Sequence, residues 1–143
     1  MPALDDNKAL VRRYVDEVWN RGDTSRATEF VADDVAVHAP PFPDGVGIDA
    51  LTGVAGAFRA ALPDLVVEVD VIAAEGDRVM HHFILTGTHS GAPLLGAEAS
   101  GHRLSTSGMT MFRVTGGRIA ASEGLFDAAG LMGQLHPAGG TQP

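Results

Sequence analysis

Apolar residues recur at helical spacing in four stretches of the chain. The spacing predicts helices over residues 5–20, 24–31 and 47–62, and a short helix between Asp127 and Leu135. In the first stretch, Leu10, Tyr14 and Val18 lie four residues apart and form part of one broad apolar stripe. Such a stripe is typical of a helix that covers a core.

Elsewhere apolar and polar residues alternate, which is the period of a β-strand. The alternation predicts strands over residues 35–38, 65–74, 78–88, 104–114 and 118–126, with hairpin turns at 75–77 and 115–117. A proline-rich loop over 39–45 forbids regular structure, and a glycine-rich loop over 89–103 is long enough to be a lid.

Helices that are segregated from an antiparallel sheet define an α+β fold. We expect a single domain over residues 1–137 and a disordered tail over 138–143. A curved, mainly antiparallel sheet wrapped around the N-terminal helices, with a helix at the C-terminus, would enclose a cone-shaped pocket.

Composition narrows the class of partner. The chain has 143 residues, a formal net charge of −8 and no cysteine, and it carries no basic stripe. We therefore expect no nucleic-acid partner and no thiol or disulfide site. No apolar run reaches the ~18 residues that span a membrane. The first residues also lack the features of a signal peptide, so we expect a cytoplasmic protein without a membrane partner.

Asp127 lies where the last predicted strand meets the last predicted helix. Strict alternation places it on one strand face with Ile119, Ala121, Glu123 and Leu125, and we expect that face to line the pocket. Asp127 can cap the helix, or it can act as a general acid/base in an apolar cavity that raises its pKa. Glu123 is either a second pocket carboxylate or a rim carboxylate in water.

His81 falls on the apolar face of its strand with Val79, Phe83 and Leu85, so it should look into the pocket while His82 looks outward. A neutral imidazole there could donate to a substrate carbonyl or orient Asp127. The alternative is a satisfied core histidine.

Five more residues are candidates for contact with a substrate. His38 ends a short strand beside the proline-rich loop and could line the mouth. Four aromatic residues are core candidates that could also contact a ligand: Tyr14, Trp19, Phe83 and Phe112. We expect no metal, because no histidine pair has ligand spacing, and no nucleotide, because no phosphate-binding glycine motif occurs.

Methionines mark the opposite face of the sheet. If Phe112 faces inward, Met109 and Met111 face outward together with Ile72 and Ile84. An apolar outer face predicts a homodimer interface.

Several short motifs occur in a fixed order along the chain. They are Asn20-Arg-Gly-Asp23, Asp34-Val-x-x-His38, Pro63-Asp64, Glu75-Gly-Asp-Arg-Val79, Gly87-Thr-His-Ser-Gly91, Phe112-Arg-Val-x-Gly-Gly-Arg-Ile119, and Phe126-Asp-x-x-Gly-Leu131 with Gln134-Leu135. Over about residues 7–136, this set resembles the SnoaL-like polyketide cyclase family of the NTF2-like superfamily.

The resemblance implies an NTF2-like cone and a cyclase of secondary metabolism. It implies intramolecular aldol condensation of a hydrophobic, carbonyl-containing molecule, with Asp127 as general acid/base and no cofactor. One residue departs from the pattern, because related sequences carry a bulky residue where this chain has Glu123. An epoxide hydrolase or isomerase using Asp127 and Glu123, and a non-catalytic protein that binds apolar ligands, are the alternatives.

Overall fold

The computed structural model describes residues 2–136. Helix α1 (Pro2–Tyr14) continues into a π-helical turn, Val15–Asn20, which we call the π turn. The remaining elements are α2 (Ile48–Ala61), α3 (Ala128–Leu135) and six strands: β1 (Val31–His38), β2 (Gly45–Val46), β3 (Val66–Glu75), β4 (Arg78–Thr88), β5 (Arg103–Thr115) and β6 (Arg118–Phe126).

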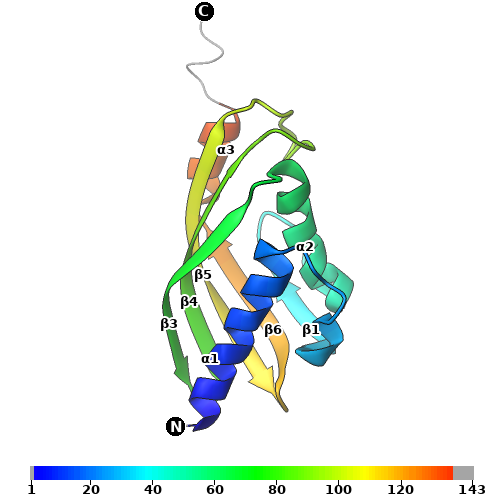
Figure 1. Ribbon diagram of the computed structural model, residues 1–143, viewed down its shortest axis with the longest axis vertical. Coiled ribbons are helices and arrows are strands. Elements are labelled where there is room, and N and C mark those ends of the chain that lie inside the picture. Colours follow the sequence, from blue (N-terminus) through cyan, green and yellow to red (C-terminus); the bar gives the residue numbers. More distant parts are fainter. Residues whose placement is uncertain (1, 137–143) are drawn as a thin grey trace, which may run out of the picture.

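The strands form one sheet in the order β2-β1-β6-β5-β4-β3. All neighbours are antiparallel except β1 and β6, which run parallel. Figure 1 shows a strongly curved sheet with α1 and α2 over one face and α3 at the end near the C-terminus. This arrangement confirms the expected α+β cone.

The apolar stripe of α1 and the inner face of the sheet form the core. Val11, Val15 and Val18 are fully or almost fully buried, and they pack in one cluster with strand residues such as Val79 and Phe112. This burial accounts for the helical period of the first segment, because one face of the helix covers the sheet.

The helix expected over residues 24–31 is wrong. Only a 3-10 turn, Ala27–Glu29, forms there, and the chain already enters β1 at the buried Val31. Strand β2 was also not expected, since it lies at the end of the proline-rich loop and pairs with β1 through Val46 and Ala36. Strand pairing, which is a tertiary contact, determines both the early start of β1 and the formation of β2.

Two β-bulges reverse the alternation of side chains. In β3 the pairing shifts between Val69 and Val71, and in β6 it shifts between Ile119 and Ala121. One extra residue moves every later side chain to the opposite face. Val71 therefore points outward, with 59% of its surface exposed. Ile72 packs against the core, contrary to its expected place on the outer face.

The loop between β4 and β5, whose length suggested a lid, is attached to the end of α2 by backbone hydrogen bonds. The backbone amides of Gly91 and Ala92 donate to carbonyls of Ala61 and Ala60 at the end of α2. The buried His89 bonds through Nε2 to the Ala92 carbonyl at 3.0 Å. The loop thus closes the C-terminal end of α2.

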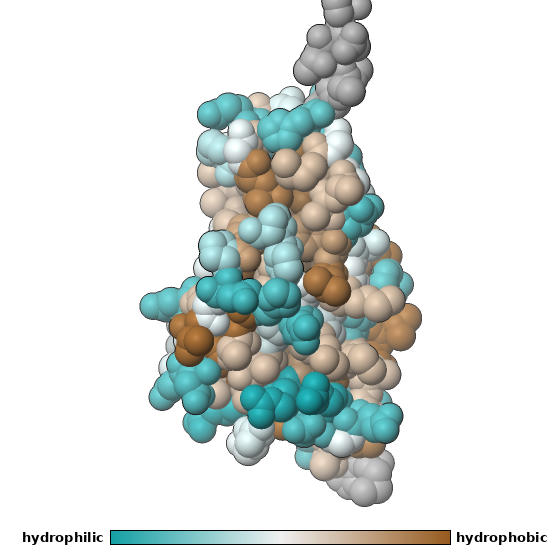
Figure 2. All heavy atoms as spheres, turned by 180° about the vertical axis from the view of Figure 1, so that it is seen from behind, coloured by the Kyte–Doolittle hydropathy of each residue, from teal (hydrophilic) through white to brown (hydrophobic). Residues whose placement is uncertain are grey.

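The outer face of the sheet carries apolar side chains in separate patches. Figure 2, seen from behind, shows brown patches divided by hydrophilic side chains. The expected tail over residues 138–143 lies outside the described residues. In the described part of the chain, no helix is long and apolar enough to cross a membrane.

Candidate active site

A cavity of about 70 Å³ lies between the π turn, α2 and the inner face of the sheet. We call it the cone pocket. Its lining residues are Tyr14, Val15, Trp19, Val37, Ala39, Leu51, Val54, Phe58, Val67, His81, Phe83, Leu85, Thr106, Thr110, Phe112, Ser122, Gly124, Leu125 and Phe126. No Asp, Glu, Lys or Arg side chain belongs to this lining, so the pocket is predominantly apolar with a few neutral polar groups.

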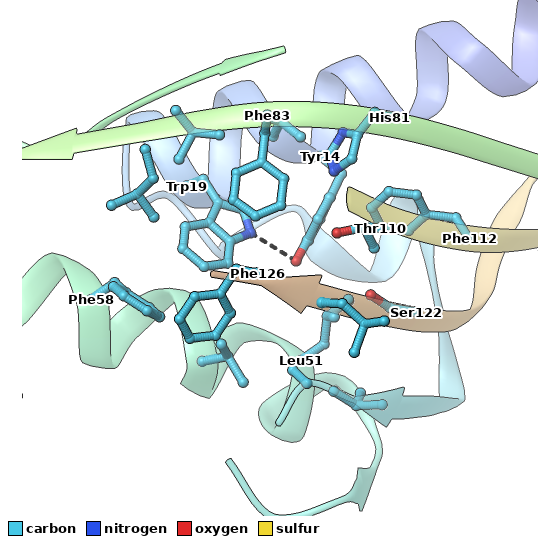
Figure 3. Close-up of a pocket in the computed structure, with 18 of the residues that line it drawn as sticks. Tyr14, Trp19, Leu51, Phe58, His81, Phe83, Thr110, Phe112, Ser122 and Phe126 are labelled. Carbon is cyan, nitrogen blue, oxygen red and sulfur yellow. Dashed lines mark hydrogen bonds between the residues drawn. The ribbon is translucent and has the colours of Figure 1, made fainter. Parts of the chain in front are cut away.

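The only tyrosine and the only tryptophan of the chain are bonded to each other on the pocket wall. Trp19 Nε1 donates a hydrogen bond to the Tyr14 hydroxyl oxygen at 3.0 Å (Figure 3). No acceptor among residues 2–136 takes the hydroxyl proton of Tyr14. The proton is therefore available to a molecule in the pocket.

Tyr14 is kept neutral by its surroundings. Burial raises the pKa of the Tyr14 hydroxyl above its usual value, and the bond from Trp19 opposes part of that rise. The group can thus donate a hydrogen bond at neutral pH without losing its proton.

His81 is the only ionisable ring in the lining besides Tyr14. Its side chain is 5% exposed, and burial lowers its pKa to about 4. The imidazole is therefore neutral at pH 7. Its Nδ1 atom is buried and has no hydrogen-bond partner among the described residues. An unpaired buried nitrogen is costly, so a ligand that supplied a partner would be favoured.

Tyr14 and His81 flank the same ring. The Phe112 centroid lies 5.7 Å from that of Tyr14 and 5.1 Å from that of His81, both edge-on. Figure 3 shows the two polar side chains at one end of the pocket, with Thr110 and Ser122 beside them. On the other side of Tyr14 lie Trp19, Phe58 and Phe126, and the Phe58 ring centroid is 5.8 Å from that of Trp19 and 5.9 Å from that of Phe126.

Glu123 and Asp127 do not lie on the inner face, so that prediction is wrong. The bulge in β6 turns Ser122, Gly124 and Phe126 inward and leaves Glu123 exposed on the outer face. Asp127 is exposed as well, and its Oδ1 accepts from the Gly130 amide at 2.9 Å. This bond caps α3, which was the ordinary alternative for Asp127.

His38 also points away from the pocket. Its neighbour Val37 lines the pocket, and the alternation of β1 turns His38 outward, where Nδ1 lies 2.6 Å from Asp44 Oδ1. The other expected contact residues do lie in the lining: Tyr14, Trp19, His81, Phe83 and Phe112.

Three hydroxyl residues of the lining were not found from the sequence. Thr110 and Ser122 add hydroxyls beside Tyr14, and Thr106 Oγ1 donates to the Asp127 carbonyl at 3.3 Å. Strict alternation from Phe112 already places Thr110 and Thr106 on the inner face of β5, so that signal was present. For Ser122 no such signal existed, because the bulge that turns it inward arises from the pairing of β6 with β5.

A metal centre finds no support in the described part of the chain. Within residues 2–136, no three His, Asp or Glu side chains gather closely enough to hold an ion.

The curved sheet, the covering helices and the apolar pocket are those of an NTF2-like α+β cone. A model of the SnoaL-like polyketide cyclase family matches residues 9–135. The chain therefore belongs to the SnoaL-like polyketide cyclase family. A search of curated proteins found no match.

Solved structures agree with this assignment. A protein from Jannaschia Sp. CCS1 assigned as a SnoaL-like polyketide cyclase has a TM-score of 0.87 at 23% identity, over 96% of both chains. IdmH from Streptomyces antibioticus, assigned as a polyketide cyclase, has a TM-score of 0.73 at 27% identity, over 91% of this chain and 98% of its own.

A third similar structure has a different assignment. An LEH-like epoxide hydrolase from M. tuberculosis has a TM-score of 0.71 at 16% identity, over 94% of this chain and 92% of its own. At this identity, as with the Jannaschia protein, the likeness shows the fold alone.

Proposed function

We propose that the cone pocket binds an apolar, carbonyl-containing small molecule and promotes its intramolecular aldol-type cyclisation by acid/base chemistry. The observation that carries this proposal is the bond from Trp19 to Tyr14. It fixes the Tyr14 oxygen on the pocket wall and leaves its proton free for a substrate oxygen. Membership of the cyclase family supports the same reaction class.

The chemistry begins with loss of a proton from a carbon beside a carbonyl. The electron pair of the broken C–H bond moves to the carbonyl oxygen, which becomes an enolate and accepts a hydrogen bond from Tyr14. The neutral His81 takes the proton. The enolate carbon then attacks a second carbonyl of the same molecule, and the new alkoxide recovers the proton from His81.

The surroundings of His81 suit this cycle. A pKa of about 4 makes the free imidazole a weak base, so the proton transfer depends on stabilisation of the enolate. The Tyr14 donor acts in a cavity without competing charges, where a hydrogen bond to an anion is stronger than in water. The two groups therefore have to act together.

Enolisation can be tested without knowing the natural substrate. Acetophenone in deuterium oxide exchanges its methyl protons slowly, and NMR follows the exchange. We expect the protein to accelerate it, and Tyr14→Phe or His81→Phe to reduce the acceleration by ~100-fold, the effect of losing an oxyanion donor or a general base. Exchange at the uncatalysed rate with the unchanged protein would refute the proposal.

The family resemblance offers Asp127 as the general acid/base instead. For this role its carboxylate would have to leave the Gly130 amide and turn toward the pocket. Asp127→Asn preserves both shape and capping. Loss of exchange in this variant, with exchange retained in His81→Phe, would favour Asp127 over His81.

Two other functions give different results in the same experiment. A protein that only binds apolar ligands would bind acetophenone without accelerating exchange. An epoxide hydrolase or isomerase using Asp127 and Glu123 would need both carboxylates in the pocket, whereas Glu123 is exposed on the outer face. The apolar lining thus supports binding alone as the stronger of the alternatives.

A further inference from the structure

The π turn brings Trp19 to Tyr14. A π-helix closes hydrogen bonds between residues five apart, and here the Arg21 amide donates to the Asp16 carbonyl at 3.0 Å. Residues five apart therefore share a face, as Tyr14 and Trp19 do. In an α-helix, five residues turn the chain about 140° past a full turn, which would separate the two side chains.

A π turn is rare because it is less favourable than an α-helix, so something must hold it. Arg59 of α2 donates from Nη1 to the carbonyls of Trp19 at 2.7 Å and Asn20 at 3.0 Å. These carbonyls end the helix and have no partner within it. A cation at a helix C-terminus is also favoured by the helix dipole.

The chain after the π turn is shaped around Arg59. Gly22 has a φ of +66°, and a Cβ atom there would lie 2.5 Å from Arg59 Nε. The glycine therefore lets the backbone turn closely over the guanidinium group.

Helix α2 holds Trp19 in two ways. Phe58, the residue before Arg59, places its ring centroid 5.8 Å from that of Trp19. One residue thus contacts the indole ring while the next holds the carbonyl of the same tryptophan.

A second attachment holds the other side of the turn. Asn20 Nδ2 donates to the Val67 carbonyl at 3.0 Å, and the Val67 amide donates to Asn20 Oδ1 at 2.7 Å. Asn20 therefore pairs with β3 as a short strand would. The π turn is fixed between α2 and β3, on either side of the pocket.

We propose that Arg59 is the positioning residue for the Tyr14 donor. By holding the π turn, Arg59 keeps Trp19 bonded to Tyr14 and so keeps the Tyr14 proton directed at the ligand. The inference rests on the proposed function for the use of that donor, but the geometric part can be measured without a ligand. Arg59 itself is outside the lining and does not touch a substrate.

The variant that removes the guanidinium group and its charge is Arg59→Gln. Its matched control is Arg118→Gln, because Arg118 also donates to a backbone carbonyl, that of Thr28 at 3.1 Å, and neither residue belongs to the pocket lining. Arg59→Lys keeps the charge but lacks the planar guanidinium group. Should Arg59→Gln fail to fold, the lysine variant carries the test, with thermal melting to verify folding.

Two readouts separate positioning from plain stabilisation. Fluorescence of Trp19, the only tryptophan, reports its bond to Tyr14 in the ligand-free protein. We expect Arg59→Gln and Tyr14→Phe each to shift its emission, and the double variant to shift it no further than the larger single change. Arg118→Gln should leave the emission unchanged.

The second readout is the acetophenone exchange rate in a double-mutant cycle. We expect Arg59→Gln to slow exchange by ~10-fold, the effect of weakening one hydrogen bond to a charged group. In the Tyr14→Phe background, Arg59→Gln should change the rate by less than ~2-fold, since interacting residues are not additive.

The outcomes separate the two proposals. Unchanged Trp19 emission in Arg59→Gln, or equal rate losses in both backgrounds, would overturn the role of Arg59. If the emission shifts as expected but the unchanged protein accelerates no exchange, the proposed function fails while the positioning role of Arg59 stands.

Discussion

Trp19 Nε1 donates to the Tyr14 hydroxyl oxygen at 3.0 Å, and both side chains line the cone pocket. The bond joins the only tryptophan to the only tyrosine of the chain. Each residue therefore reports on the other without interference, which makes the pocket accessible to simple spectroscopy.

Alkaline titration should show a delayed ionisation of Tyr14. Burial raises its pKa above the ordinary value of 10, so the tyrosine absorbance should change only at a higher pH than in the urea-unfolded chain. Because the bond from Trp19 lowers the pKa, Trp19→Phe should move the ionisation higher still. The unfolded state loses its proton first, so stability falls as the pH rises above about 10. Coincident titrations of the folded and unfolded chains would contradict this.

Acid should destabilise the protein through His81. The pKa of His81 is about 4 in the folded state, compared with 6.5 for an unburied histidine in the unfolded chain. The unfolded state therefore binds the proton first as the pH falls. The contribution of the neutral, buried His81 to the free energy of unfolding is therefore fully present above pH 6.5, and it is lost between pH 6.5 and 4. The loss amounts to about 3 kcal/mol.

Urea unfolding at several pH values measures this effect. His81→Phe cannot titrate and suits the aromatic surroundings of Phe83 and Phe112. Its free energy of unfolding should therefore vary less between pH 6.5 and 4 than that of the unchanged protein. Parallel profiles for the two proteins would show that His81 is not the titrating group.

Asp127 should act on stability through its cap on α3. Asp127→Ala removes the acceptor of the Gly130 amide and should lower the free energy of unfolding by about 1 kcal/mol. Asp127→Asn keeps an oxygen acceptor and should cost less. Glu123→Gln is the control, because Glu123 is an exposed carboxylate on the preceding strand without a cap. Equal stability of the alanine and asparagine variants would contradict the capping role.

The outer face of the sheet should mediate a homodimer. Val71, Met109 and Leu125 are 59%, 65% and 59% exposed, and they lie in one row that runs from β3 through His82 of β4 to β5 and β6. Light scattering should give twice the chain mass, and Met109→Glu should shift it toward the monomer by placing a charge in the interface. Val46→Glu, at the far edge of the sheet, should not. A monomer before any substitution would refute the prediction.

Local patterning already determined much of this protein. The helical stripe of residues 5–20 and the alternation of residues 78–88 placed Tyr14, Trp19, His81 and Phe83 around a common pocket. These segments bury one face against the core, and burial of one face leaves a regular apolar period in the sequence.

Only the tertiary structure decided which carboxylates reach the pocket and how Tyr14 is held. The alternation in β6 holds only as far as Ile119, because the bulge before Ala121 shifts its phase and turns Glu123 outward. A bulge arises from pairing with β5, which the local sequence does not show. The π turn likewise depends on Arg59 and on the bonds of Asn20 to Val67, which come from distant parts of the chain. Sequence periodicity records which residues are buried, whereas strand register and helix winding are set by partners that the local sequence does not contain.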